Sequence, residues 1–134
     1  MNPKAKAWGT LLLAVVLCLV WAWQQGLIGG SSSNPPVHNG VVAEADLPSQ
    51  ARDTLARIDA RGPFKFDQDG ATFENREGLL PKKPRGYYHE YTVKTPHSRD
   101  RGARRIVCGG RQPTAPEACF YTADHYASFK LITQ

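Results

Sequence analysis

Cysteine and histidine are scarce in this chain, and no group of them has the spacing of a metal site. The 134 residues include three cysteines and four histidines. His89 and His97 lack cysteine or carboxylate companions at the positions that zinc sites use. The sequence also contains no internal repeat, which excludes repeat architectures. We therefore expect no bound metal and no cofactor.

Acidic residues are few in the C-terminal part of the chain. Residues 76–134 contain eleven lysines and arginines but only five aspartates and glutamates, whereas residues 46–75 contain four bases and six acids. The formal net charge of the whole chain is +5. A basic half of a domain indicates a polyanionic partner, although a solubilising surface has the same composition.

A long hydrophobic run occurs once, near the N-terminus. Lys4 and Lys6 precede an uncharged apolar run at residues 7–23, and this order is typical of an export signal. The run is also just long enough to span a bilayer, and Trp21 and Trp23 are bulky where a cleavage site usually has small residues. The sequence therefore predicts export and leaves open whether the segment is cleaved or retained as an anchor.

We expect three parts along the chain. Residues 1–30 are predicted to be a signal peptide or N-terminal membrane anchor, residues 31–45 a flexible linker, and residues 46–134 a folded domain. The linker is rich in glycine, serine and proline, and a short apolar run at its end, residues 41–43, can add an edge segment. The expected location is secreted or extracytoplasmic (periplasmic), with membrane contact only through the N-terminal segment.

Two cysteines of the folded part are predicted to form a disulfide. Cys18 lies in the hydrophobic segment, which leaves Cys108 and Cys119, and pairing is favoured in an exported protein. They flank a short loop that contains two glycines and two prolines. If the flanking runs pair as antiparallel strands, the two cysteines lie opposite each other at a distance that a disulfide can bridge.

The pattern of the folded part predicts an α+β domain, with one helix packed on an antiparallel sheet. The helix is expected to begin at residues 47–49 and to end at Gly62 and Pro63, with Ala51, Leu55 and Ile58 on its apolar face. Strands are expected at residues 87–93, 104–108, 119–122 and 127–132, with tight connections between them.

One stretch, residues 86–93, places a carboxylate among aromatic side chains. Its composition favours a strand, so Tyr88, Glu90 and Thr92 share one face of the sheet. A desolvated charge needs partners, and four arginines follow within residues 99–105. Glu90 therefore indicates either a structural ion-pair network or a site that binds a polyanion and moves a proton.

Four segments together resemble the microbial guanyl-specific ribonucleases, the small extracellular family that includes barnase and the Streptomyces enzymes. They are residues 73–77, 86–93, 101–107 and 121–129. They occur in the family order, and the resemblance extends over residues 47–132. It implies a metal-independent endoribonuclease that cleaves single-stranded RNA after guanosine, forming a 2′,3′-cyclic phosphate and then hydrolysing it to a 3′-phosphate.

The resemblance also implies catalytic roles at the matching positions. Glu90 would be the general base and His125 the general acid. Arg101 and Arg105 would hold the phosphate and oppose the charge that develops on its oxygens. Tyr126 would donate a hydrogen bond to the same phosphate.

The loop at residues 73–77 is expected to read guanine. Glu77 would accept hydrogen bonds from guanine N1–H and N2–H, Asn75 and Arg76 would present backbone N–H groups, and Phe73 would stack on the base. Glu74 stands where the streptomycete enzymes have glutamine. Its extra negative charge is expected to weaken affinity for RNA while sparing guanine recognition.

Two other functions remain open at this stage. The chain could be a basic RNA-binding module with weak or no catalysis, in which the arginines bind phosphate and Glu90 only anchors them. It could also be a ribonuclease toxin delivered to competing cells, with a small acidic, barstar-like inhibitor as a partner. We expect a monomer in either case.

Overall fold

The computed structural model describes residues 40–112 and 114–134. The predicted export segment and residues 31–39 of the predicted linker lie outside them. Within the described ranges, no helix is long and apolar enough to cross a membrane.

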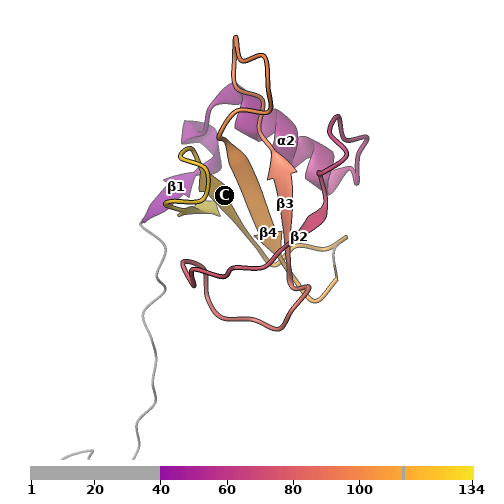
Figure 1. The fold of residues 1–134 in the computed structure, drawn as a ribbon, viewed down its shortest axis with the longest axis vertical. Helices are drawn as coiled ribbons and strands as arrows, with labels where there is room; N and C mark the ends of the chain where they lie inside the picture. The colour runs from indigo at the N-terminus through magenta and orange to yellow at the C-terminus, as the bar shows by residue number, and fades with distance from the viewer. Residues whose placement is uncertain (1–39, 113) are drawn as a thin grey trace, which may run out of the picture. The chain divides into compact units, whose positions relative to one another are not determined.

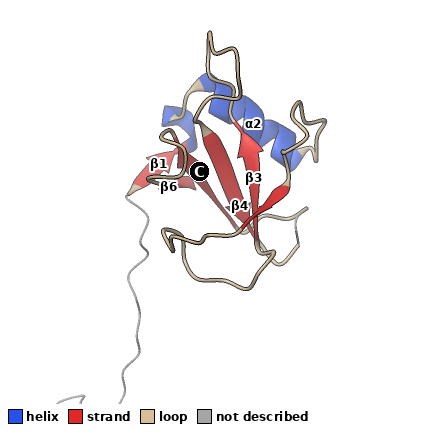
Figure 2. Ribbon diagram, viewed as in Figure 1, coloured by secondary structure: helices blue, strands red, loops and turns tan. Residues whose placement is uncertain are grey.

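One α-helix lies across one face of a sheet (Figures 1 and 2). The sheet has six strands in the order β1-β6-β5-β4-β3-β2. The elements, in chain order, are β1 (Val41–Ala43), the 3-10 helix η1 (Glu44–Asp46), α2 (Ser49–Asp59), β2 (Ala71–Phe73), β3 (Tyr88–Thr92), β4 (Arg105–Gly109), β5 (Ala118–Thr122) and β6 (Lys130–Thr133).

The sheet is mixed, so the prediction of a purely antiparallel sheet was wrong at one edge. Strand β1 pairs in parallel with β6, with Val41 opposite Leu131, while the remaining pairs are antiparallel. Residues 41–43, which were expected to be able to add an edge segment, form this edge strand, and residues 44–46 form the 3-10 helix. Backbone hydrogen bonds to β6 order this segment, as Leu131 N–H donates to the carbonyl of Gly40.

Strand β2 was not predicted, and β6 begins later than expected. Residues 71–73 are too short and too mixed in polarity to show a period of two, yet they pair with β3, Ala71 opposite Glu90 and Phe73 opposite Tyr88. At the other end, Ser128 is held away from the sheet because its N–H and Oγ–H both donate to the carboxylate of Asp124. The strand therefore starts at Lys130 instead of residue 127.

Helix α2 follows Pro48 and buries Ala51, Thr54, Leu55 and Ile58, as its predicted apolar face requires. Its C-terminal end closes through two backbone bonds, Arg61 N–H to the Ile58 carbonyl and Gly62 N–H to the Arg57 carbonyl. This is the bonding pattern of a Schellman motif. Both Arg61 and Gly62 have positive φ angles. Glycine adopts such angles without steric cost, which suits Gly62 to its position.

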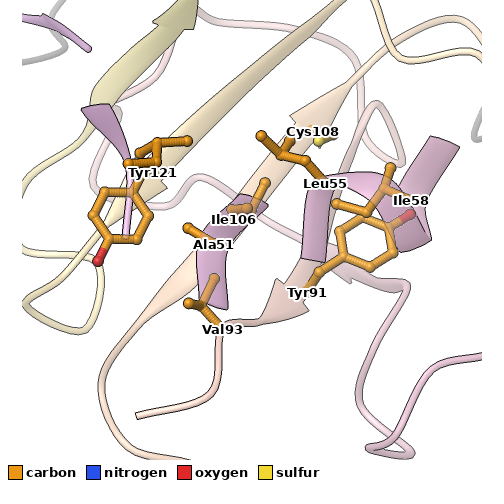
Figure 3. Packing of buried hydrophobic residues seen from close by; sticks show 9 residues of the cluster. Ala51, Leu55, Ile58, Tyr91, Val93, Ile106, Cys108 and Tyr121 are labelled. Carbon is orange, nitrogen blue, oxygen red and sulfur yellow. The ribbon is translucent and has the colours of Figure 1, made fainter. Parts of the chain in front are cut away.

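The two faces of the sheet have separate apolar clusters. The helix side contains Tyr91, Val93, Ile106, Cys108 and Tyr121 against the buried face of α2 (Figure 3). The opposite side contains Leu80, Tyr88, Val107, Phe120 and Phe129. This alternation of side chains along β3 is the predicted one, and it puts Glu90 on the face without the helix.

The predicted disulfide is confirmed. Cys108 on β4 and Cys119 on β5 are directly paired in the antiparallel register, and their sulfur atoms are bonded. The bridge lies on the helix side of the sheet. It therefore braces the β4–β5 hairpin without contacting the opposite face.

Candidate active site

Glu90 lies in the middle of β3 and is joined to a residue far along the chain. The hydroxyl of Tyr126 donates a hydrogen bond to Glu90 Oε2. Because Tyr126 belongs to the β5–β6 connection and Glu90 to β3, this connection folds over the open face of the sheet, across β4. The ring of Phe73 on β2 stacks on that of Tyr126, with centroids 5.2 Å apart, so the connection reaches the far edge of the sheet.

Arg105 is the deeply buried cation of this face. It is only 2% exposed, and its Nη1 donates to the carbonyl oxygens of Gly102 and Arg104 at 2.9 and 2.8 Å. Its guanidinium carbon lies 6.0 Å from the centroid of the Tyr126 ring. Its Nε–H is buried without a hydrogen-bond partner among the described residues. A buried donor without a partner costs free energy, and an anionic oxygen at this place would satisfy it.

Arg101 is held against the end of β3 by Thr92, a residue for which no role was predicted. Its Nε and Nη2 both donate to the hydroxyl oxygen of Thr92, at 3.1 and 2.9 Å, and its guanidinium carbon lies 6.0 Å from the centroid of the Phe66 ring. Alternation along β3 predicted that Thr92 shares the face of Glu90. No local signal indicated that its hydroxyl would accept from an arginine nine residues away.

The backbone of Thr92 is fixed from two sides. Its N–H donates to Asp69 Oδ1 at 2.7 Å, and its carbonyl accepts from the hydroxyl of Thr54 at 3.2 Å. The second oxygen of the Asp69 carboxylate accepts from Phe66 N–H. The side chain of Thr92 is therefore a fixed point for Arg101, and Asp69 ties the α2–β2 connection to the same end of β3.

His125 lies exposed in the β5–β6 connection, beside Tyr126. Their ring centroids are 4.9 Å apart, and the N–H of His125 donates to the carbonyl of Ala103 at 3.0 Å. His125 and Tyr126 have positive φ angles of 53° and 70°, which are uncommon for such residues. The turn around them is braced by Asp124, whose carboxylate accepts from Thr122, from Ser128 N–H and from Ser128 Oγ–H. The bonds from Ser128 lower the pKa of Asp124, which keeps it ionised and accepting.

The loop expected to read guanine is held by the side chain of Asn75. Its Nδ2 donates to the carbonyl of Leu80 at 2.9 Å, and its Oδ1 accepts from Leu80 N–H at 3.0 Å. Asn75 has a positive φ of 49°, and its own carbonyl accepts from Gly78 N–H. The side chain of Asn75 thus fixes the loop conformation, and only the backbone of Asn75 is available to bind a ligand.

The remaining loop residues lie at the surface. Arg76 and Glu77 are exposed, and in the described residues no hydrogen bond or ion pair engages the Glu77 carboxylate. Glu74 forms a 3.6 Å ion pair with Arg85 in the connection that leads to β3. An exposed pair of this kind contributes little stability, but it offsets part of the negative charge that Glu74 adds.

The structure thus brings the predicted catalytic residues to one face. Tyr126 donates to Glu90 and its ring lies beside the guanidinium of Arg105, Arg101 adjoins through Thr92, and His125 lies beside Tyr126. Phe73 extends this cluster toward the predicted guanine loop. In residues 40–112 and 114–134 no group of three or more His, Cys, Asp or Glu residues is placed to hold a metal ion.

Three comparisons with known proteins agree with this arrangement. A family model described as ribonuclease matches residues 31–133. Guanyl-specific ribonuclease Sa3 of Kitasatospora aureofaciens is 57% identical over 93 residues, which is 69% of this chain and 63% of Sa3. Guanyl-specific ribonuclease Sa of the same organism is 51% identical over 96 residues, covering 72% of this chain and 96% of Sa.

Solved structures of ribonuclease Sa2 share the fold. A structure from a study of Sa2 complexes with mononucleotides superposes with a TM-score of 0.67 at 49% identity, covering 75% of this chain and 98% of Sa2. Another, with guanosine-2′-cyclophosphate, gives a TM-score of 0.63 at 50% identity, covering 70% and 95% of the two chains. Because the family model and the relatives span most of the described domain, this chain belongs to the microbial guanyl-specific ribonuclease family.

Proposed function

We propose that this chain is an endoribonuclease that cleaves single-stranded RNA after guanosine, through a 2′,3′-cyclic phosphate that it then hydrolyses to a 3′-phosphate. The observation that carries the proposal is the convergence on Tyr126 of a carboxylate and a buried cation: Tyr126 donates to Glu90, and the guanidinium of Arg105, whose Nε–H lacks a partner among the described residues, lies beside its ring. A base and an anion-binding donor on one face are the two features that internal attack on a phosphodiester needs.

In the first step, Glu90 takes the proton of the ribose 2′-OH, and the 2′-oxygen attacks phosphorus. The bond from phosphorus to the 5′-oxygen breaks, and His125, as imidazolium, gives its proton to that oxygen. Arg105 Nε–H, which has no partner among the described residues, and the guanidinium of Arg101 oppose the charge on the phosphate oxygens. In the second step the roles reverse: His125 takes a proton from water, whose oxygen attacks phosphorus, the bond from phosphorus to the 2′-oxygen breaks, and Glu90 returns a proton to that oxygen.

Tyr126 can donate a hydrogen bond both in the free site and when RNA is bound. Burial and the Glu90 carboxylate raise the pKa of Tyr126 to about 12, so its hydroxyl keeps its proton at neutral pH. Without substrate it donates to Glu90. We propose that it turns to a phosphate oxygen when RNA is bound, which leaves the carboxylate free to accept the 2′-OH proton.

Guanine recognition is proposed for the loop at residues 73–77. The unengaged carboxylate of Glu77 can accept from guanine N1–H and N2–H together, a pair of donors that no other RNA base presents. The clasp between Asn75 and Leu80 fixes the loop backbone for the N–H groups of Asn75 and Arg76. Phe73 already stacks on Tyr126, so its ring offers the base at most its second face or its edge.

The relatives support the proposed specificity and pathway. Sa and Sa3 are each called guanyl-specific, and Sa2 has been solved with guanosine-2′-cyclophosphate and with 3′-GMP. These two ligands have the form of the intermediate and of the product of the two steps above. Their chemistry therefore supports a cyclising mechanism for this chain.

We also propose that the enzyme is exported and that a small inhibitor protein can bind it. The Cys108–Cys119 disulfide suits an oxidising compartment, which supports a secreted or extracytoplasmic enzyme delivered by the N-terminal segment. The four basic residues between Arg99 and Arg105 could also meet a small acidic inhibitor protein by charge complementarity.

The deciding experiment is digestion of a defined single-stranded RNA with both ends of every product mapped. We expect cuts after guanosine alone, a transient 2′,3′-cyclic phosphate, a final 3′-phosphate, and no effect of a chelator. Equal cutting after all four nucleotides, or activity that a chelator abolishes, would contradict the proposal.

A further inference from the structure

Three consecutive carbonyl groups just before β4 hold two of the residues proposed for catalysis. The carbonyls of Gly102 and Arg104 accept from Arg105 Nη1 at 2.9 and 2.8 Å. Between them, the carbonyl of Ala103 accepts from the backbone N–H of His125 at 3.0 Å. These three peptide units therefore orient a phosphate-binding cation and the segment of the general acid together.

The three peptide units belong to the β3–β4 connection, which Figure 1 shows as a loop beyond the ends of the two strands. At its base, Val93 N–H donates to the carbonyl of Arg104 at 3.1 Å. Gly102 and Ala103 lie beyond this bond, outside the β3–β4 pairing. The directions of their carbonyls are therefore determined within the connection itself.

The side chain of Asp100 bonds to the backbone of the connection at this point. Its Oδ1 accepts from Gly102 N–H at 2.8 Å and from the hydroxyl of Ser98 at 2.7 Å. The bond from Ser98, and after it the bond from Gly102 N–H, lower the pKa of Asp100. Asp100 is therefore ionised at neutral pH and accepts both bonds.

Gly102 lies directly against the other arm of the connection. Its φ angle is +63°, and a Cβ built at this position would lie 2.2 Å from Thr95 Oγ1. A contact this close leaves no room for a side chain at position 102. Because Gly102 is confined in this way, the bond from its N–H to Asp100 fixes the peptide units that follow.

The charge of Asp100 and its hydrogen bonds predict opposite effects on RNA cleavage. Asp100 is exposed, and it is the one acid among the four arginines of residues 99–105. A negative charge there weakens the positive field that attracts RNA phosphates, so its removal alone should favour binding. Loss of the bond to Gly102 N–H should instead disturb the groups that act on the phosphate.

We propose that Asp100 is a positioning residue for the proposed cleavage: its bond to Gly102 N–H orients the carbonyls that hold Arg105 and His125. Asp100 itself does not touch the substrate. The inference rests on the proposed function. It adds a residue that lies outside the four segments on which the family resemblance depends.

The test compares two substitutions of Asp100. Asp100→Asn removes the charge but keeps Oδ1 as an acceptor, and its kcat/KM on a guanosine dinucleotide should equal or exceed that of the parent. Asp100→Ala removes the acceptor as well. Misplacing reacting groups by about 1 Å can cost about 10²-fold in rate, and a partial shift should cost about tenfold. This loss should lie mainly in kcat, whereas a change in RNA attraction alone would alter KM.

A control variant removes the same charge elsewhere. Asp59→Ala changes an exposed acid at the end of α2, on the side of the sheet away from Glu90, and should leave kcat and KM at the parent values. Equal kcat in the alanine and asparagine variants of Asp100, both folded at the assay temperature, would overturn the positioning role. So would a loss of kcat in Asp59→Ala as large as that in Asp100→Ala.

Amide hydrogen exchange followed by NMR tests the inference without any substrate. The N–H of His125, bonded to Ala103, should exchange faster in Asp100→Ala than in the parent or in Asp100→Asn. The N–H of Leu131, bonded to Gly40 at the sheet edge, should exchange equally in all three. Failure of the parent to cleave any RNA would refute the proposed activity, whereas unchanged exchange at His125 in Asp100→Ala would refute the positioning role.

Discussion

The hydroxyl of Tyr126 donates a hydrogen bond to the carboxylate of Glu90, which joins the β5–β6 connection to the centre of β3. The two residues are 36 positions apart in the sequence. Their contact orders the connection that also contains His125, so one bond links the proposed base to the segment of the proposed acid. Its consequences can be measured in stability as well as in catalysis.

The first prediction concerns alkaline pH. Burial first, and then the bond to Glu90, raise the pKa of Tyr126 to about 12, above the value of about 10 in an unfolded chain. The folded protein therefore holds this proton more tightly. The stabilisation is complete below about pH 10 and is lost as the pH rises toward 12.

Urea unfolding at a series of pH values from 8 to 11.5 measures this effect. The free energy of unfolding should fall more steeply with pH in the parent than in Tyr126→Phe. Tyr88→Phe is a suitable comparison, because burial raises the pKa of Tyr88 to about 12 as well, without a carboxylate partner. Parallel curves for the parent and Tyr126→Phe would show that the Tyr126 hydroxyl does not titrate as described.

The second prediction concerns the proposed acid. His125→Gln should lower kcat by about 10²-fold to 10⁴-fold, the usual contribution of one positioned proton donor. It should leave RNA affinity nearly unchanged, because Arg101 and Arg105 remain. Steady-state cleavage of a guanosine dinucleotide provides the rate. If this variant cleaves at the rate of the parent protein, His125 is not the general acid.

The third prediction concerns specificity. Glu77→Ala should reduce cleavage after guanosine far more than cleavage after adenosine, because the carboxylate pairs with two donors that adenine lacks. A site that hydrogen-bonds its substrate can discriminate by roughly 10⁴-fold, so most of the guanosine preference should disappear. The measurement is kcat/KM for two dinucleotides that differ only in the 5′ base. A uniform loss on both would place Glu77 outside base recognition.

The fourth prediction concerns the anchoring of Arg101. Thr92→Val keeps the buried shape but removes the oxygen that accepts from Nε and Nη2 of Arg101. Because hydrogen bonds to charged groups are worth about 1.5–3 kcal/mol, kcat/KM should fall by about tenfold or more. Thr92→Ser restores the acceptor and should recover most of the activity. Equal activity of the valine and serine variants would show that Thr92 does not position the arginine.

The fifth prediction concerns the hairpin. Replacing Cys108 and Cys119 together by alanine removes a bond that closes a loop with a sequence separation of 11. The chain-entropy model gives a loss of about 3 kcal/mol in the free energy of unfolding. Because the bridge lies on the helix side of the sheet, kcat should be unchanged at a temperature where the variant is folded. A selective loss of kcat in the folded variant would show that the bridge shapes the site.

Part of the site and much of the fold could be predicted from local sequence, whereas the family resemblance supplied the other site residues. The period of two along residues 86–93 placed Glu90 and Thr92 on one face of β3, and the short loop between two strands placed Cys108 opposite Cys119. The apolar spacing of Ala51, Leu55 and Ile58 predicted the helix and its buried side. These features depend on neighbours within a few residues, where side-chain direction follows directly from backbone geometry.

Other features were decided by the tertiary structure alone. The parallel pairing of β1 with β6 and the short edge strand β2 depend on hydrogen bonds to distant strands, which leave little trace in three-residue sequences. The bonds of Tyr126 to Glu90 and of Arg101 to Thr92 join a loop to a strand. The bond to Glu90 also comes from a residue with a positive φ, Tyr126, a backbone angle that local propensity disfavours and that the packing of the domain stabilises.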